Sequence, residues 1–315
     1  MDGNGSNIEI FKPFGEAFEL MKKILFQPFD LKKWLVIGFA AWLANLGAGG
    51  GGAGNFNYPD SREDAHKLNE TIGQIPQPVL ITGICVLVCV VLLLIVLFAW
   101  LRARGRFILV DCIVRNRAAI AEPWKEFRAE GNSFFLFSLL VALVLIPVIA
   151  IAGLVLIVPF IPWGSQAQPG ITFWIGLGLF VFVAVCLAFV WALTSQLMVP
   201  IMYRQRCRAR LAFAQAVDLV TSHPGPILLY VLFLLLLAVA VFMIACAVTC
   251  ATCCIAAIPY VGTVILLPIP VTLGAFSLLF LRQFGSEYDV WAGFTPPEFL
   301  PVLVPPPAPP GTEAS

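Results

Sequence analysis

The sequence predicts an all-α integral membrane protein, a polytopic transmembrane helical bundle of six spans with both termini in the cytoplasm. Three observations lead to this fold class. The 315 residues are 60% hydrophobic and only 12% charged, whereas soluble domains carry about 25% charged residues. The apolar residues form long runs without charge, and the lysines and arginines gather between alternate runs. The net charge of +1 gives no global field that would favour nucleic acid as a partner.

Six segments are predicted to cross the bilayer, because a span of roughly 30 Å of hydrocarbon takes about 20 apolar residues. Five runs are long enough by themselves. The remaining segment, WLVIGFAAWLANLGA, which comes first in the chain, reaches spanning length only if the glycines after it continue the helix. In chain order the predicted spans are about 34–53, 79–101, 134–160, 171–201, 226–252 and 259–281. Residues 1–283 are therefore expected to form a single transmembrane domain.

The distribution of lysine and arginine sets the direction of the spans. Short loops rich in these residues stay on the cytoplasmic side of a membrane. Seventeen of the 19 lie in residues 1–33, 102–133 and 202–225 or at Arg282, and the other two are Arg62 and Lys67 in the loop after the first span. If the first run did not cross, the lysines at the N-terminus would lie outside with that loop. The charges thus favour six spans with an N-in/C-in topology.

Each of the three basic segments precedes a pair of spans and carries large apolar residues at positions i, i+4 and i+7. These residues are Phe14, Phe18 and Met21; Ile120, Trp124 and Phe127; and Phe213, Val217 and Val220. That spacing lines one face of a helix, and a basic amphipathic helix beside a span lies in the membrane interface. The chain is therefore divided into three amphipathic-helix-plus-hairpin units. Either a true threefold repeat or an alternating topology with basic loops would produce this pattern.

Two segments carry a resemblance to known families. LFQPFDLKKWLVIGFAAWLANLGAGGGG (25–52) resembles an uncharacterised prokaryotic family of six-span membrane proteins, a domain of unknown function. The last span, IPYVGTVILLPIPVTLGAFSLLFLRQF (258–284), is distantly similar to the closing span of membrane domains found beside glycerophosphodiester phosphodiesterases. The sequence contains no phosphodiesterase domain, so the resemblance implies a fold and not that activity. It also implies a prokaryotic plasma membrane as the location.

The candidate binding residues are arginines of the second and third basic segments. Each cation near an anionic membrane surface contributes about 1 kcal/mol of attraction. Contacts with anionic lipids or with other membrane proteins are therefore predicted for Arg204, Arg206, Arg208, Arg210, Arg115 and Arg117. Asp111 lies four residues before Arg115, and an ion pair on one helix face is favoured over a substrate-binding role for this acid.

Prolines of the sixth span support an alternative interpretation. Pro268 and Pro270 interrupt that span, and a proline in a membrane helix frees carbonyls that must find partners or line a cavity. Together with Gln196 they form a candidate cavity for a facilitator of an uncharged or amphiphilic solute. A simple kink in the helix is the other explanation of these prolines.

The sequence offers no constellation for catalysis or cofactor binding, so no enzyme activity, cofactor or metal is expected. None of the six spans contains Asp, Glu, Lys, Arg or His, which argues against ion-coupled transport. For Cys246, Cys250, Cys253 and Cys254, packing of small residues is favoured over a disulfide or a soft-metal site. Residues 284–315 are rich in proline and are predicted to be a disordered cytoplasmic tail.

Overall fold

A computed structural model describes residues 9–46, 76–157, 171–252 and 258–292, and all regular secondary structure in these ranges is α-helical. The predicted loop with Arg62 and Lys67, as well as Cys253, Cys254 and the chain beyond residue 292, lies outside these ranges. The helices are α1 (Phe11–Phe26), α2 (Leu31–Ala44), α4 (Gln77–Val114), α5 (Ala121–Glu126), α6 (Arg128–Ile157), α7 (Ile171–Gln205), α8 (Ala209–Ser222), α9 (Pro224–Ala251), α10 (Pro259–Ile265) and α11 (Pro268–Arg282).

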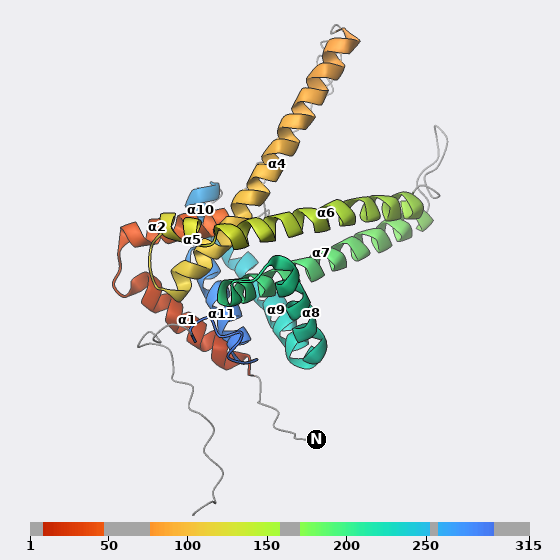
Figure 1. The fold of residues 1–315 in the computed structure, drawn as a ribbon. Coiled ribbons are helices and arrows are strands. Elements are labelled where there is room, and N and C mark those ends of the chain that lie inside the picture. The colour runs from red at the N-terminus through yellow and green to blue at the C-terminus, as the bar shows by residue number, and fades with distance from the viewer. Residues whose placement is uncertain (1–8, 47–75, 158–170, 253–257, 293–315) are drawn as a thin grey trace, which may run out of the picture.

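Four helices of the described chain are long and apolar enough to cross a membrane. They comprise all of α4 and α9, residues Arg128–Leu154 of α6 and residues Phe173–Gln205 of α7. Only 0% to 11% of the residues in their most apolar stretches are buried within the protein. Apolar surface of this extent requires a non-aqueous environment. Figure 1 shows α4 extending alone from the rest of the molecule, while α6 and α7 extend side by side.

The predicted first and sixth spans are shorter in the described part of the chain. The helix α2 ends at Ala44, and the glycines after residue 46 are not described. The sixth span is divided into α10 and α11, of 7 and 15 residues. The structure therefore supports the all-helical class and four membrane-length helices, while a count of six spans rests on the sequence.

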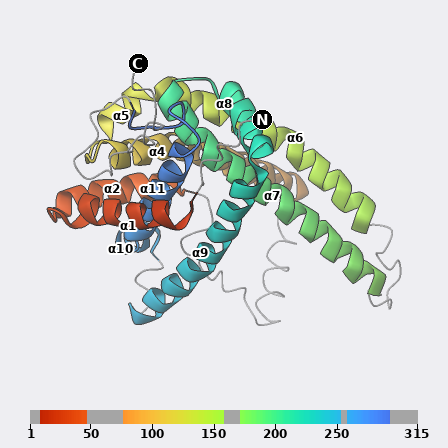
Figure 2. The same cartoon turned by 90° about the horizontal axis from the view of Figure 1, so that it is seen from below.

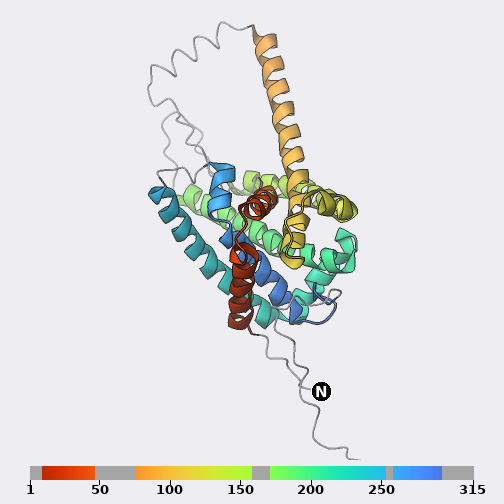
Figure 3. The same cartoon turned by 90° about the vertical axis from the view of Figure 1, so that its left-hand side faces the viewer.

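The buried core lies where the helix ends meet, away from the apolar halves of the long helices. Buried residues from Ile10 to Trp291 form one hydrophobic cluster. Its most completely buried aromatic members, each 0% exposed, are Phe107 of α4, Tyr230 of α9, and two α11 residues, Phe276 and Phe280. The helices α1 and α11 pack against each other, and Figures 2 and 3 show the long helices running outward from the region where they meet.

The helix α2 packs against both α4 and α10 through close contacts. Gly105 of α4 lies so near the backbone of α2 that a Cβ there would be 2.6 Å from the nitrogen of Ala44. On the other side of α2, the indole Nε1 of Trp34 donates a hydrogen bond of 3.0 Å to the carbonyl of Val264. Pro268 follows four residues later and has no N–H to bond that carbonyl. The predicted first and last spans thus satisfy each other's packing and hydrogen-bonding needs.

The three amphipathic segments bury faces that only partly match the prediction. Met21 of α1 and Phe127, just after α5, are in the core, while Phe18 is 44% exposed and Val217 is 41% exposed. In α8 the most buried face comprises Ala209, Ala212, Ala216 and Leu219. Alanine lets two helix backbones approach closely, and α8 packs mainly against α7.

The packed chain extends beyond the predicted start of the disordered tail at residue 284. Val290 and Trp291 are 1% and 2% exposed, and the indole Nε1 of Trp291 donates to the carbonyl of Val114 at the end of α4. Arg282 and Asp289 form an ion pair of 3.1 Å. The prediction of disorder was wrong for this segment, because the proline content that suggested it begins only after Trp291.

Candidate functional site

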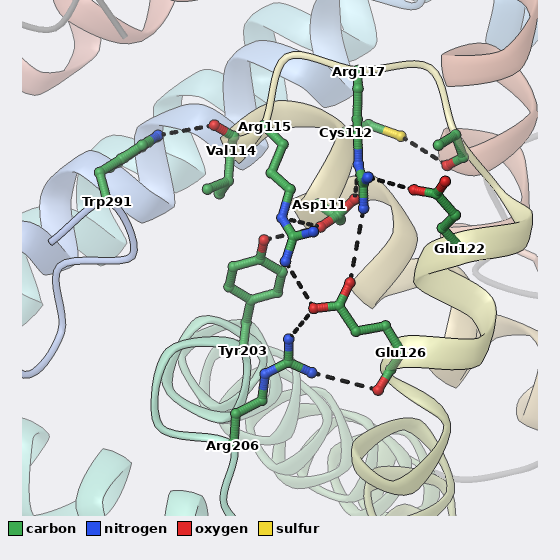
Figure 4. Close-up of polar contacts among 11 residues, drawn as sticks. Asp111, Cys112, Val114, Arg115, Arg117, Glu122, Glu126, Tyr203, Arg206 and Trp291 are labelled. Carbon is green, nitrogen blue, oxygen red and sulfur yellow. Dashed lines mark hydrogen bonds and ion pairs between the residues drawn. The ribbon is translucent and has the colours of Figure 1, made fainter. Parts of the chain in front are cut away.

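The main polar site of the described chain is built around Asp111, in the last turn of α4. Its carboxylate is fully buried; it accepts hydrogen bonds from two side chains and forms an ion pair with a third (Figure 4). Arg115 Nε lies 3.1 Å from Oδ1, Arg117 Nε donates to Oδ2 at 3.0 Å, and the hydroxyl of Tyr203 donates to Oδ1 at 3.0 Å. A buried carboxylate is stable when it is paired and hydrogen-bonded in this way.

Glu126 of α5 connects the same arginines to α7. Its Oε1 accepts from Arg115 Nη2 at 2.7 Å and is also in contact with Arg206. Arg117 makes a further ion pair of 2.5 Å with Glu122. We call these seven residues the Asp111 network: Asp111, Arg115, Arg117, Glu122, Glu126, Tyr203 and Arg206. It joins the end of α4 and the neighbouring α5 to the end of α7, which is far from both in the sequence.

Two residues of the connecting turns have left-handed backbone conformations. Asn116 has φ of 49° and Arg206 has φ of 52°. For a residue other than glycine this conformation costs about 1 kcal/mol. Arg206 is held in it by Glu126, by Glu130 at 3.5 Å and by the ring of Phe127, whose centroid lies 3.9 Å from the guanidinium carbon. The network therefore fixes the path of the chain between α7 and α8.

The arginines of the network favour the ionised form of Glu126. Burial raises the pKa of Glu126, but hydrogen bonds from Arg115 and Arg206 outweigh that effect and hold its pKa below the ordinary value. Asp111 has no exposed surface through which a substrate could reach it. This arrangement is chemically suited to clamping helix ends together and not to proton transfer with a ligand.

The structure divides the six predicted arginines into two groups. Arg115, Arg117 and Arg206 belong to the Asp111 network, and the predicted ion pair between Asp111 and Arg115 is confirmed. Arg204, Arg208 and Arg210 have no carboxylate within ion-pairing distance in the described part of the chain, and Arg208 and Arg210 are exposed. Three of the six arginines thus pair with carboxylates of the protein, and the other three are available to a lipid or to a partner protein.

The residues of the candidate cavity occupy different surroundings. Gln196 is exposed on α7, whereas Pro268 and Pro270 are partly buried in the first turn of α11. The carbonyl of Val264 accepts from Trp34, and the carbonyl of Pro268 accepts from the hydroxyl of Thr272 at 2.7 Å. The break in the sixth span is therefore supplied with partners from the protein itself.

A polar pocket of about 310 Å³ lies at the start of α2. Its lining residues are Asp30, Lys32, Lys33, Val36, Asn116 and Ala118. Lys33 donates from Nζ to Asn116 Oδ1 at 2.8 Å, and burial lowers the pKa of its amine although Asp30 opposes that shift. Asp30 also caps α2 by accepting from the N–H of Lys32 at 2.8 Å. The lining residues therefore already bond one another.

The cysteines of the described ranges are unpaired, and Cys246 and Cys250 are exposed on α9. Within those ranges, no three His, Cys, Asp or Glu side chains are close enough to hold a metal ion. Cys253 and Cys254 lie outside the described ranges, so packing of small residues stays the prediction for this cluster.

A second group of arginines, not identified from the sequence, lies where α4 enters the core. Arg102, Arg104 and Arg106 follow the apolar part of α4 directly, in the sequence LRARGRF. The guanidinium of Arg104 contacts the rings of both Trp100 and Trp124, 4.5 Å and 4.9 Å from their centroids. The signal that could have identified them is the alternation of arginines with small residues immediately after an uncharged run.

The fold and its polar site define an all-helical membrane protein whose charged groups gather where its apolar helices converge. A family of unknown function (DUF7544) matches residues 9–290, and the chain belongs to that family. The resemblance of the sequence to an uncharacterised family is therefore confirmed. No curated protein and no solved structure matches the chain.

Proposed function

We propose that this chain is a non-enzymatic, six-span protein of a prokaryotic plasma membrane that binds anionic lipid through basic helices on its cytoplasmic side. The observation that carries the proposal is the trio Arg204, Arg208 and Arg210, cations without an ion-pair partner in the described part of the chain. Each such cation near an anionic surface adds about 1 kcal/mol of attraction.

The surroundings of the trio fit a membrane surface. The apolar part of α7 ends just before Arg204, and Leu211 and Val217 of α8 are 53% and 41% exposed. Arginines beside exposed apolar side chains at the end of a span are typical of an interfacial segment. The basic segments precede pairs of spans, so a cytoplasmic position of α1, α5 and α8 follows from the charge distribution.

The test is retention of lipid by the purified full-length protein. Changing Arg204, Arg208 and Arg210 together to glutamine removes three cations without removing an ion pair of the described structure. We expect the variant to retain at least tenfold less phosphatidylglycerol than the wild type from mixed vesicles, while its retention of phosphatidylcholine stays the same.

The matched control is Arg62→Gln with Lys67→Gln, in the loop predicted to lie outside. It should leave retention of both lipids unchanged. Equal phosphatidylglycerol retention by the triple variant and the wild type would refute lipid binding through this trio. Unchanged lipid retention together with loss of a co-purified membrane protein would assign the trio to a protein partner instead.

The alternative function is a facilitator for an uncharged or amphiphilic solute. The division of the sixth span into two helices gives it little support. Its carbonyls at Val264 and Pro268 have protein partners. Solute uptake into proteoliposomes that is lost on changing Pro268 and Pro270 to alanine would support this function. Uptake that does not depend on these prolines would exclude the cavity as its route.

A further inference from the structure

We propose that Arg102 and Arg106 form a phosphate-binding site for the head group of an anionic phospholipid, at the junction between the apolar part of α4 and the core. The inference rests on the proposed function in one respect, namely that this end of α4 lies at a membrane surface. It concerns a different helix and different residues from the trio on α7 and α8.

The position of the two arginines matches the depth of lipid phosphates. The uncharged run 79–101 of α4 has 23 residues, and at 1.5 Å per residue it is about 34 Å long. A bilayer has a hydrocarbon core of roughly 30 Å. Arg102 is the first residue after this run, so both arginines fall in the layer of lipid head groups when α4 crosses the membrane.

Arg102 and Arg106 project from the same side of α4, because they are four residues apart in a helix. Both side chains are partly buried. The guanidinium of Arg106 lies 5.6 Å from the ring centroid of Phe134, which places it beside α6. Arg104 projects from the other side of α4, where Asn132 accepts from it at 2.9 Å. The pair is thus separate from Arg104, which packs on the two tryptophans.

The pair lacks the partners that a buried cation requires. Across the residues that the structure describes, neither Arg102 nor Arg106 has a carboxylate within 4.0 Å or a hydrogen bond. The Nε of Arg102 is buried and has no acceptor. Two like charges four residues apart on a helix repel each other, and desolvated charges are normally neutralised. An anion between them would satisfy both requirements.

Phosphate is the anion that this geometry favours. Guanidinium groups bind phosphate through two parallel N–H···O bonds, and two of them on adjacent turns could approach one phosphate from two directions. The neighbouring surface of α4 is apolar and exposed, including Leu94 and Phe98 at 41% and 43%. A phospholipid would place its acyl chains on this surface with its phosphate at the arginines, which a free phosphate ion cannot do.

The experiment uses the full-length protein in detergent and measures its unfolding temperature. The added ligands are dioctanoyl phosphatidylglycerol, dioctanoyl phosphatidylcholine and inorganic phosphate. We expect phosphatidylglycerol to raise the unfolding temperature of the wild type, with phosphatidylcholine and phosphate having no effect. In Arg102→Gln with Arg106→Gln, the apparent affinity for phosphatidylglycerol should fall at least tenfold. The matched control, Lys125→Gln with Arg128→Gln, removes two exposed charges nearby and should bind as the wild type does.

A second readout separates ligand binding from a structural role. Without lipid, the Arg102→Gln, Arg106→Gln variant should be as stable as the wild type or more so, since the two arginines that it replaces have no carboxylate partner in the described part of the chain. The lysine variant at both positions keeps the charges but loses the paired N–H groups, and should also bind more weakly. A loss of stability without lipid, or undiminished phosphatidylglycerol binding, would overturn the site. If inorganic phosphate stabilises the protein through the same two residues, the ligand of the site is a free anion and not a lipid.

The two proposals fail separately. If the glutamine pair on α4 binds phosphatidylglycerol normally while the triple variant at Arg204, Arg208 and Arg210 loses lipid retention, the site is wrong and the proposed function stands. If the triple variant retains lipid and the α4 pair does not bind it, the site stands and the role of the trio is wrong.

Discussion

Replacing Gly105 with alanine tests the contact between α2 and α4, on which the arrangement of the core depends. The new Cβ would lie 2.6 Å from both the nitrogen of Ala44 and the carbonyl carbon of Leu43. Backbone atoms cannot rotate away, so one helix must move by about 1 Å for an ordinary contact distance. Overpacking of this kind costs about 1–3 kcal/mol. Alanine favours the helix over glycine by about 1 kcal/mol. Because the clash is with backbone atoms, its cost exceeds this gain, and we expect Gly105→Ala to destabilise the protein.

Gly83 provides a matched control on the same helix, because nothing lies within 4 Å of the Cβ position there. The assay is thermal unfolding of each variant in one detergent, followed by fluorescence of the tryptophans. We expect Gly105→Ala to unfold at a lower temperature than the wild type and Gly83→Ala at an equal or higher one. If the two variants were equally stable, the close approach of α2 and α4 would be refuted.

Two further predictions concern the Asp111 network. Asp111→Asn removes the buried charge that pairs with two arginines and should destabilise the protein by about 3 kcal/mol. The control, Asp218→Asn at an exposed position, should have no effect in the same unfolding assay. Equal stabilities of the two variants would contradict a clamping role for Asp111. The lowered pKa of Glu126 means that its ionised form stabilises the fold above its unfolded pKa of about 4.3, and that this stability is lost as the pH falls through the lower folded value. Unfolding temperatures measured against pH should therefore fall in acid for the wild type and fall less for Glu126→Gln.

The local elements were predictable because they depend on near-neighbour patterns. An apolar run longer than the bilayer forms a helix whatever surrounds it, since its backbone groups must bond within the segment. The runs that became α4, α6, α7 and α9 needed no tertiary information. The same is true of the ion pair between Asp111 and Arg115, which one helical turn brings together.

Other features could not be found in the sequence because they join residues far apart in the chain. Tyr203 and Asp111 are 92 residues apart, and Trp34 and Val264 are 230 apart. Burial of α8 through its alanines depends on how closely α7 can approach it, which a pattern of large apolar residues does not report. The packing of Trp291 on α4 likewise depends on a carbonyl that only the folded chain presents.

By itself, the sequence determined that the chain is helical and belongs in a membrane, because hydropathy and charge distribution act through solvent and not through particular contacts. Tertiary structure decided which arginines are neutralised. Arg115, Arg117 and Arg206 meet carboxylates. In contrast, Arg102 and Arg106 on α4, and the trio Arg204, Arg208 and Arg210 at the end of α7 and the start of α8, meet none within the described chain. The physical reason is that an ion pair depends on separations of a few ångströms, which follow from the packing of helices and not from their order.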